Sequence, residues 1–62
     1  MVERVKRIAD YITEKSGVYV SDRMVKRLAR RAHDPLPLRK FGARVVADEK
    51  ELAAWIGRQW SS

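Results

Sequence analysis

The sequence predicts a small α+β domain that is mostly helical, and three observations support this prediction. Apolar residues recur at helical spacing over residues 3–15, over residues 21–33 and again after residue 48. A stretch around a glycine, between the second and third of these segments, is typical of a β-hairpin. The chain has 62 residues and no cysteine, so packing, helix caps or a partner must stabilise it without disulfides or thiolate-bound zinc. We therefore expect one domain over residues 1–62.

The first predicted helix extends from about Glu3 to Lys15. Its apolar positions follow the i, i+3, i+4, i+7 rule and share one face: Val5, Ile8, Ala9 and Ile12. Gly17 follows Ser16 and can adopt the left-handed conformation that ends a helix. Residues 18–20 are too few and too β-branched to continue the helix. They are expected to form a connector that buries one or two side chains.

The second predicted helix covers about residues 21–33. Ser21 or Asp22 can cap it by accepting a bond from a free backbone N–H. The expected buried stripe consists of Val25, Leu28, Ala29 and Ala32. Asp34 precedes a proline and is expected to stop the helix. The last turns would then hold three side chains that complement the helix dipole: Arg30, Arg31 and His33.

A hairpin over residues 38–46 and a closing helix are predicted for the rest of the chain. Two short extended runs flank Gly42 in the hairpin. Asp48 and Glu51 have the spacing of a capping box, in which each side chain bonds a backbone N–H of the other residue. One face of the helix that follows is expected to close the core: Leu52, Trp55, Ile56 and Trp60. In this order the elements form a winged helix-turn-helix.

Positive charge is concentrated in the middle of the chain. Residues 1–20 carry four basic and three acidic side chains, residues 21–44 carry eight and two, and residues 45–62 carry two and three. The three segments therefore have charges of +1, +6 and −1, and the whole chain has +6. A localised patch of this kind favours a polyanionic partner. A solvated face that only keeps the domain soluble is the alternative interpretation.

The order of the motifs resembles the excisionase-like branch of the mercury-resistance-regulator superfamily of small winged helix-turn-helix proteins. The resemblance covers roughly Arg7 to Gly57. The matching residues are Ile8-Ala9 and Ile12, Gly17-Val18 and Ser21, the basic run from Arg23 to Arg31, Leu36-Pro37, Phe41-Gly42-Ala43-Arg44-Val45, and Asp48 with Glu51-Leu52-Ala53-Ala54-Trp55-Ile56. The chain departs from the pattern in its connector, where residues 13–16 and 19–20 are additional.

The resemblance implies binding of double-stranded DNA, with the helix over residues 21–33 in the major groove and the wing over residues 38–46 on the backbone or in the minor groove. Members of this family act as excisionases of phages or plasmids, as small transcription regulators, or as DNA-recognition domains of phage packaging enzymes. A recombination factor would also need adjacent copies of itself on DNA and contacts to an integrase.

A helix in the major groove offers its N-terminal half to base edges and its later residues to phosphates. The predicted base-edge contacts are Ser21, Arg23, Met24 and Arg27. The predicted phosphate contacts of the helix are Lys26, Arg30 and Arg31. In the wing, Arg39, Lys40 and Arg44 are expected to bind phosphate or to enter a narrow minor groove. Adenine recognition through an amide is not expected, because the chain has no asparagine and its one glutamine is Gln59.

Several alternatives remain beside this prediction. The basic surface would also suit an adaptor that binds an acidic protein, and Arg39 and Lys40 can protect a sheet edge against aggregation. Tyr19 is expected to cover the connector, with a position near DNA as the alternative, and Met24 can be a core residue. An RNA binder is disfavoured because the basic region has few aromatic residues.

Other functions have no support in the sequence. No nucleophile–base pair or phosphate-binding loop indicates an enzyme, a cofactor or a small-molecule ligand, and His33 is a lone histidine without further metal ligands. No signal peptide or membrane span is recognisable, so we expect a cytoplasmic protein associated with the nucleoid.

Overall fold

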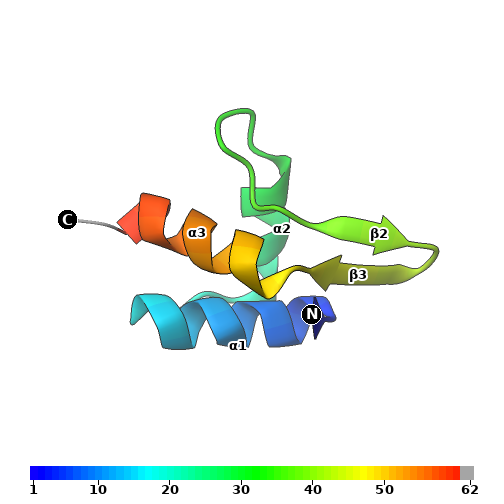
Figure 1. Cartoon of the computed structure of the whole chain (residues 1–62), viewed down its shortest axis with the longest axis horizontal. Helices are drawn as coiled ribbons and strands as arrows, with labels where there is room; N and C mark the ends of the chain where they lie inside the picture. The colour runs from blue at the N-terminus through cyan, green and yellow to red at the C-terminus, as the bar shows by residue number, and fades with distance from the viewer. Residues whose placement is uncertain (61–62) are drawn as a thin grey trace.

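Three helices and one three-stranded antiparallel sheet make up the protein in a computed structural model that describes residues 1–60 (Figure 1). This confirms the α+β class with a mostly helical chain. Residues 61 and 62 of the predicted domain lie outside the described part. In chain order the elements are β1 (Val2–Glu3), α1 (Val5–Ser16), α2 (Asp22–Arg30), β2 (Arg39–Phe41), β3 (Arg44–Ala47) and α3 (Glu49–Trp60).

The first helix begins two residues later than predicted, because Glu3 belongs to a strand. Val2 and Glu3 pair with Ala47 and Val46 of β3. The Arg4 N–H then donates to the Val45 carbonyl at 2.9 Å, and Arg4 adopts a φ of 71° that turns the chain into α1. At the other end the prediction is confirmed, since Gly17 has a left-handed φ of 76° and its N–H donates to the Thr13 carbonyl.

The connector between α1 and α2 buries Val20, as predicted, and exposes its neighbours. Val20 is 2% exposed. The Thr13 hydroxyl accepts a bond from the Val20 N–H at 2.9 Å and donates to the Ala9 carbonyl at 2.8 Å, so a side chain of α1 fixes the connector. The prediction that Tyr19 covers the connector is wrong, because its side chain is 76% exposed.

α2 begins as predicted and ends earlier. The Ser21 hydroxyl accepts a bond from the Met24 N–H at 3.3 Å, which makes Ser21 the cap. The helix ends at Arg30, so the prediction of a helix to residue 33 is wrong. Ala32 is exposed in the following loop, so the prediction that it belongs to the buried stripe is wrong. Leu36 is buried, and its N–H donates to the Leu28 carbonyl at 3.1 Å.

The predicted hairpin forms, with Gly42 at a φ of 63° in its turn. The sheet order is β1-β3-β2, and no pattern in the sequence predicts the third strand, β1. Lys40 lies opposite Val45, whereas Arg39 and Phe41 lie opposite Val46 and Arg44. Residues directly opposite share a face of the sheet and alternate residues share a face of a strand. Lys40 is therefore on one face, and Arg39, Phe41 and Arg44 are on the other.

Half of the predicted capping box forms at α3. The Asp48 carboxylate accepts a bond from the Glu51 N–H at 3.1 Å. The prediction that Glu51 reaches back to the cap is wrong, because its carboxylate accepts a bond from Arg39 at 3.1 Å. The predicted core face is confirmed for Leu52, Trp55 and Ile56, and Trp60 packs half-buried beside them.

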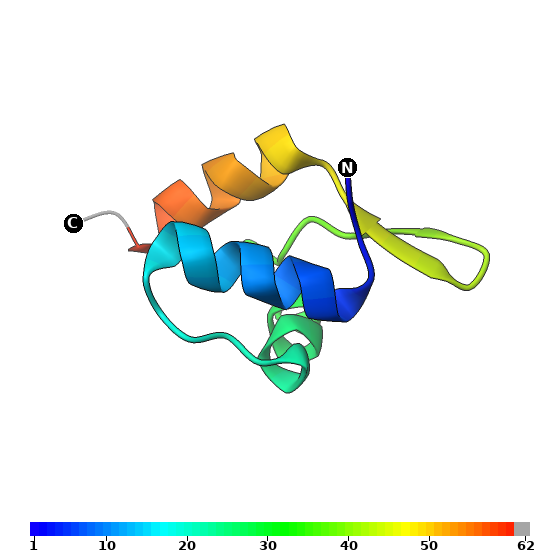
Figure 2. The ribbon, with the colours of Figure 1, turned by 90° about the horizontal axis from the view of Figure 1, so that it is seen from below.

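α1 packs against both α2 and α3, and the β2–β3 hairpin extends away from the helices at one end of the molecule (Figures 1 and 2). One core joins all three helices. It contains Ile8, Ala9, Ile12, Val20, Val25, Leu36, Ala47, Leu52, Trp55 and Ile56. Within residues 1–60 no helix has both the length and the apolar character needed to cross a bilayer.

Candidate functional site

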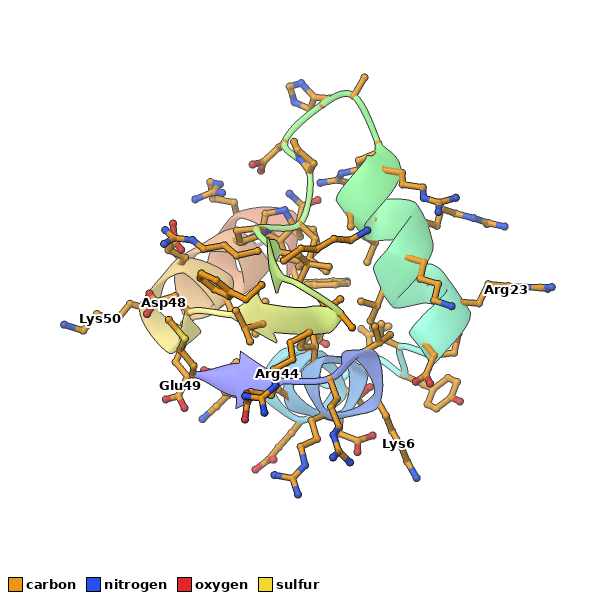
Figure 3. The ribbon with its side chains drawn as sticks, turned by 90° about the vertical axis from the view of Figure 1, so that its right-hand side faces the viewer. Lys6, Arg23, Arg44, Asp48, Glu49 and Lys50 are labelled. Carbon is orange, nitrogen blue, oxygen red and sulfur yellow. The ribbon has the colours of Figure 1, made fainter. Side chains whose placement is uncertain are left out.

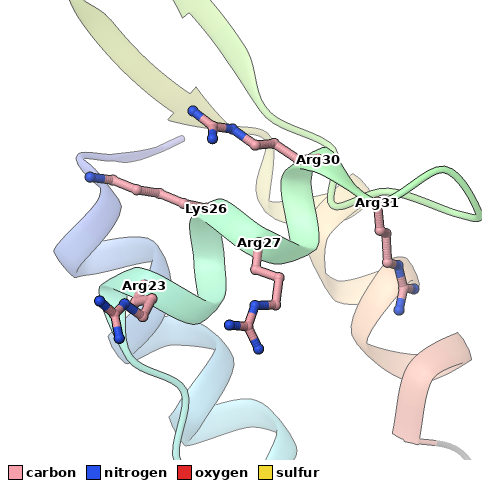
Figure 4. A pocket seen from close by; sticks show the side chains of 5 residues that line it. All are labelled: Arg23, Lys26, Arg27, Arg30 and Arg31. Carbon is pink, nitrogen blue, oxygen red and sulfur yellow. The ribbon is translucent and has the colours of Figure 1, made fainter.

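One face of α2 consists of cations. The helical turn of 3.6 residues brings positions 23, 26, 27 and 30 to neighbouring sites on one side. All four side chains are exposed, and with Arg31 they line an open groove along the helix (Figure 4). Arg23 extends from α2 into solvent, on the opposite flank of the molecule from Lys50 (Figure 3). The four cations of this face are Arg23, Lys26, Arg27 and Arg30.

The protein does not neutralise these four charges internally. Within residues 1–60, no carboxylate oxygen lies within 4.0 Å of the cationic nitrogens of Arg23, Lys26, Arg27 or Arg30. The opposite side of the helix is anchored by Val25, which is fully buried, and by the half-buried Leu28 and Ala29. The site is thus a rigid helix with an uncompensated positive face, which can attract a polyanion.

The N-terminal end of α2 carries two less polar candidates. Ser21 is half-buried, and its hydroxyl oxygen already accepts the capping bond from Met24. The hydroxyl hydrogen has no acceptor among the described residues, so it can donate to a ligand. The Met24 side chain is 37% exposed and therefore lies at the surface of the same end of the helix.

Arg31 differs from the other cations of the groove. Its Nε and Nη2 atoms donate to the Asp34 carbonyl at 3.1 and 2.9 Å, and its guanidinium lies 5.4 Å from the ring centroid of Trp55. In Figure 4 its side chain extends toward α3. A phosphate contact by Arg31 stays a prediction. It would use the Nη1 amino group, which makes neither of these two bonds.

Asp34 joins the loop after α2 to α3. Its carbonyl accepts a further bond from the Trp55 indole N–H at 2.8 Å. Its carboxylate accepts bonds from the Arg58 Nε and Nη2 atoms at 3.1 and 3.0 Å and from the Gln59 amide at 2.9 Å. We call Asp34 with Arg31, Trp55, Arg58 and Gln59 the Asp34 cluster.

The ion pair between Asp34 and Arg58 shifts the pKa of both groups. The hydrogen bonds from Arg58 hold the pKa of the Asp34 carboxyl below its ordinary value, and those same bonds raise the pKa of Arg58. Asp34 also has a φ of 46°, a conformation that aspartate and asparagine tolerate better than most residues. The sequence signalled only a turn before Pro35 here, because the partners in α3 are more than 20 positions away.

The three wing cations are not equivalent. Arg39 pairs with Glu51 of α3 at 3.1 Å, and Arg44 pairs with Glu3 of β1 at 3.5 Å. Both lie on the face of the sheet that also carries Val46. Lys40 has no carboxylate partner among residues 1–60 and lies on the other face, opposite Val45, which packs against the core with the helices. The structure therefore leaves Lys40 as the unpaired cation of the wing.

Within the described residues, no group of three His, Cys, Asp or Glu side chains is arranged to hold a metal ion, and His33 is exposed in the loop after α2. Comparison of the chain with protein-family models, with curated proteins and with solved structures finds no match.

Proposed function

We propose that this protein binds double-stranded DNA as a winged helix-turn-helix, with α2 as the recognition helix in the major groove and the β2–β3 hairpin as the wing against the backbone or in the minor groove. The observation that carries the proposal is the face of α2, where four exposed cations have no carboxylate partner in the described chain. Duplex DNA offers a dense row of negative charges to such a face.

The dimensions and anchoring of α2 suit this role. The major groove is about 12 Å wide and admits one α-helix. Val25 holds the inner side of α2 in the core, Ser21 caps its start, and the Asp34 cluster fixes the loop at its end. A helix held at both ends and along one side binds with little loss of conformational entropy.

The residues along α2 divide by their distance from the helix start. Side chains at the N-terminal end reach base edges: Ser21, Arg23, Met24 and Arg27. An arginine can donate two hydrogen bonds to the O6 and N7 atoms of guanine, which is worth about 1–3 kcal/mol of discrimination. The later cations contact phosphates: Lys26, Arg30 and Arg31.

In the wing, Lys40 is the first phosphate contact, because its charge is unpaired and it lies on the side of the sheet where the helices pack. Arg39 and Arg44 contribute after exchanging their partners Glu51 and Glu3 for phosphates. Both pairs are solvent-exposed, and exposed pairs cost about 0–1 kcal/mol to break. Six to eight phosphate contacts would give a log–log dependence of affinity on salt with a slope of about −5 to −7.

The cellular role that fits best is that of a small excisionase or transcription regulator acting on DNA in the cytoplasm, in line with the motif order described above. An excisionase would require adjacent copies on DNA and an integrase. A DNA-recognition domain of a phage packaging complex uses the same contacts. The competing hypothesis is an adaptor whose basic face binds an acidic protein, and free duplex would not be its preferred ligand.

Selection from a randomised duplex library at near-physiological salt, followed by sequencing of the retained DNA, tests the proposal. We expect an enriched motif that contains guanine at the positions facing Arg23 and Arg27. Retention without enrichment would leave a nonspecific DNA binder. Absence of retention would favour the acidic-protein hypothesis.

A matched pair of variants makes the selection specific to α2. Arg27→Ala removes one positive charge from the proposed interface, and Lys50→Ala removes one from the opposite flank of the molecule. We expect Arg27→Ala to lose the enriched motif and Lys50→Ala to retain it. Equal loss in both variants would mean that net charge, and not the face of α2, determines binding.

A further inference from the structure

Tyr19 is an aromatic residue that the fold holds in solvent. Its side chain is 76% exposed, more than that of any other large hydrophobic residue in residues 1–60. Most of a tyrosine ring is apolar and its hydroxyl is polar, so a ligand that covers the ring and accepts a hydrogen bond gains from both. Tyr11, the other tyrosine, is half-buried and packs against the core.

The connector that carries Tyr19 is fixed on both sides. Before it, the Gly17 N–H donates to the Thr13 carbonyl and the Val18 N–H donates to the Ser16 hydroxyl at 3.1 Å. After it, the Val20 N–H donates to the Thr13 hydroxyl and the Val20 side chain is buried. Val20 is thus held inward by this bond and by its burial, while Tyr19 next to it is held in solvent.

Tyr19 lies beside the end of α2 that the proposed function assigns to the major groove. It precedes the cap Ser21 by two residues, and Arg23 follows the cap by two. The edges of the groove are formed by the phosphates of the two strands. A phenol at this position is a neutral donor that can make a charge-assisted hydrogen bond to a phosphate oxygen.

We propose that Tyr19 is a DNA-contact residue whose hydroxyl donates a hydrogen bond to a backbone phosphate at the edge of the groove that α2 enters. This inference rests on the proposed function and adds a contact from outside α2 and the wing. A phosphate contact positions a protein on the duplex without reading its sequence. Tyr19 therefore strengthens binding to all duplexes alike.

Tyr19→Phe removes only the hydroxyl and tests the contact directly. We expect it to weaken binding to a fluorescently labelled mixed-sequence duplex by about tenfold, the effect of one hydrogen bond to a charged group. The slope of log affinity against log salt should stay unchanged, because a neutral side chain displaces no counterion. By contrast, Lys26→Ala should reduce the magnitude of that slope by about 0.9.

Tyr11→Phe is the matched control, since it removes a hydroxyl from the other tyrosine, and it should bind like the wild type. Circular dichroism of each variant checks that the fold is retained. If Tyr19→Phe binds like the wild type while Lys26→Ala binds more weakly, the inference is wrong and the proposed function stands. If Tyr19→Ala weakens binding and Tyr19→Phe does not, the ring matters and the hydroxyl contact is likewise rejected. If the wild type does not bind duplex, the proposed function itself fails.

Discussion

The cations of α2 and three arginines of the hairpin and α3 differ in whether a carboxylate lies beside them. Arg39, Arg44 and Arg58 each lie within 3.5 Å of a carboxylate, on Glu51, Glu3 and Asp34 respectively. The four cations of α2 have no such partner within the described chain. Carboxylates therefore offset these three arginines, whereas the four cations grouped on α2, like Lys40 of the hairpin, have no such partner within residues 1–60.

This difference indicates where an external polyanion would bind. Exposed ion pairs add little to stability, about 0–1 kcal/mol each, but each one cancels a positive charge at the surface. The acidic residues of β1 and of the first turn of α3 lower the potential around Arg39 and Arg44. Four cations without a carboxylate partner are grouped on one face of α2, so the arrangement of the charges is a better guide to the interface than net charge.

Charge reversal in the unpaired region should have the largest effect on DNA binding. We expect Arg23→Glu combined with Arg27→Glu to weaken duplex binding more than about a hundredfold, because two contacts worth about 1–3 kcal/mol each are replaced by repulsion. Fluorescence anisotropy with a labelled duplex measures this change. Lys15→Glu combined with Lys50→Glu gives the same net charge through two residues outside α2 and should leave most of the affinity intact. Similar losses in the two double variants would remove the distinction between the regions.

Within the wing, a smaller effect should separate Lys40 from Arg39. Lys40→Ala should weaken duplex binding by up to about eightfold at about 0.1 M salt, the counterion release of one phosphate contact. Arg39→Ala should reduce the affinity less, because Arg39 must break its ion pair with Glu51 before it contacts DNA. Affinities of the two variants, measured on one duplex, decide the order. A larger loss for Arg39→Ala would show that the ion pair opens readily on DNA.

The Asp34 cluster should have its main effect on the stability of the fold at acidic pH and a smaller effect on DNA binding. The pKa of Asp34 is lower in the folded chain than its ordinary value, so its ion pair stabilises the fold above the unfolded pKa, near pH 4, and this stability is lost as pH falls through the folded pKa. Asp34→Asn, which keeps the size and tolerates the positive φ, should denature at a lower temperature at pH 7 and lose less stability on acidification.

Thermal denaturation followed by circular dichroism at several pH values checks this prediction. Asp10→Asn is the control, because Asp10 is an exposed carboxylate on α1 without an ion-pair partner among residues 1–60. If Asp34→Asn and the wild type lose stability in parallel below pH 4, the ion pair with Arg58 contributes nothing to the fold.

Features with local causes could be predicted from the sequence. The stripes of α1 and α3 follow from apolar spacing, and Gly17, Ser21 and Asp48 act at helix ends through bonds to residues three or four positions away. The cationic face of α2 follows from helical periodicity in the same way. What the spacing could not reveal was which cations have carboxylate partners.

Features with distant causes could not be predicted. β1 has only two residues, and its partners in β3 lie more than 40 positions away, so no periodicity marks it. α2 ends early because Leu36 returns to the core and Asp34 binds α3. Tyr19 is exposed because a threonine of α1 fixes the backbone beside it. Each of these depends on contacts that become adjacent only in the folded chain.

The most direct test of the central claim is an NMR titration of the isotope-labelled protein with a mixed-sequence duplex. We predict that backbone amide shifts change over residues 21–31 and at Lys40, and that the exposed residues Lys50, Ala53 and Ala54 of α3 are unaffected. Changes centred on α3, or no changes on addition of duplex at near-physiological salt, would contradict the account and remove α2 as a DNA-binding element.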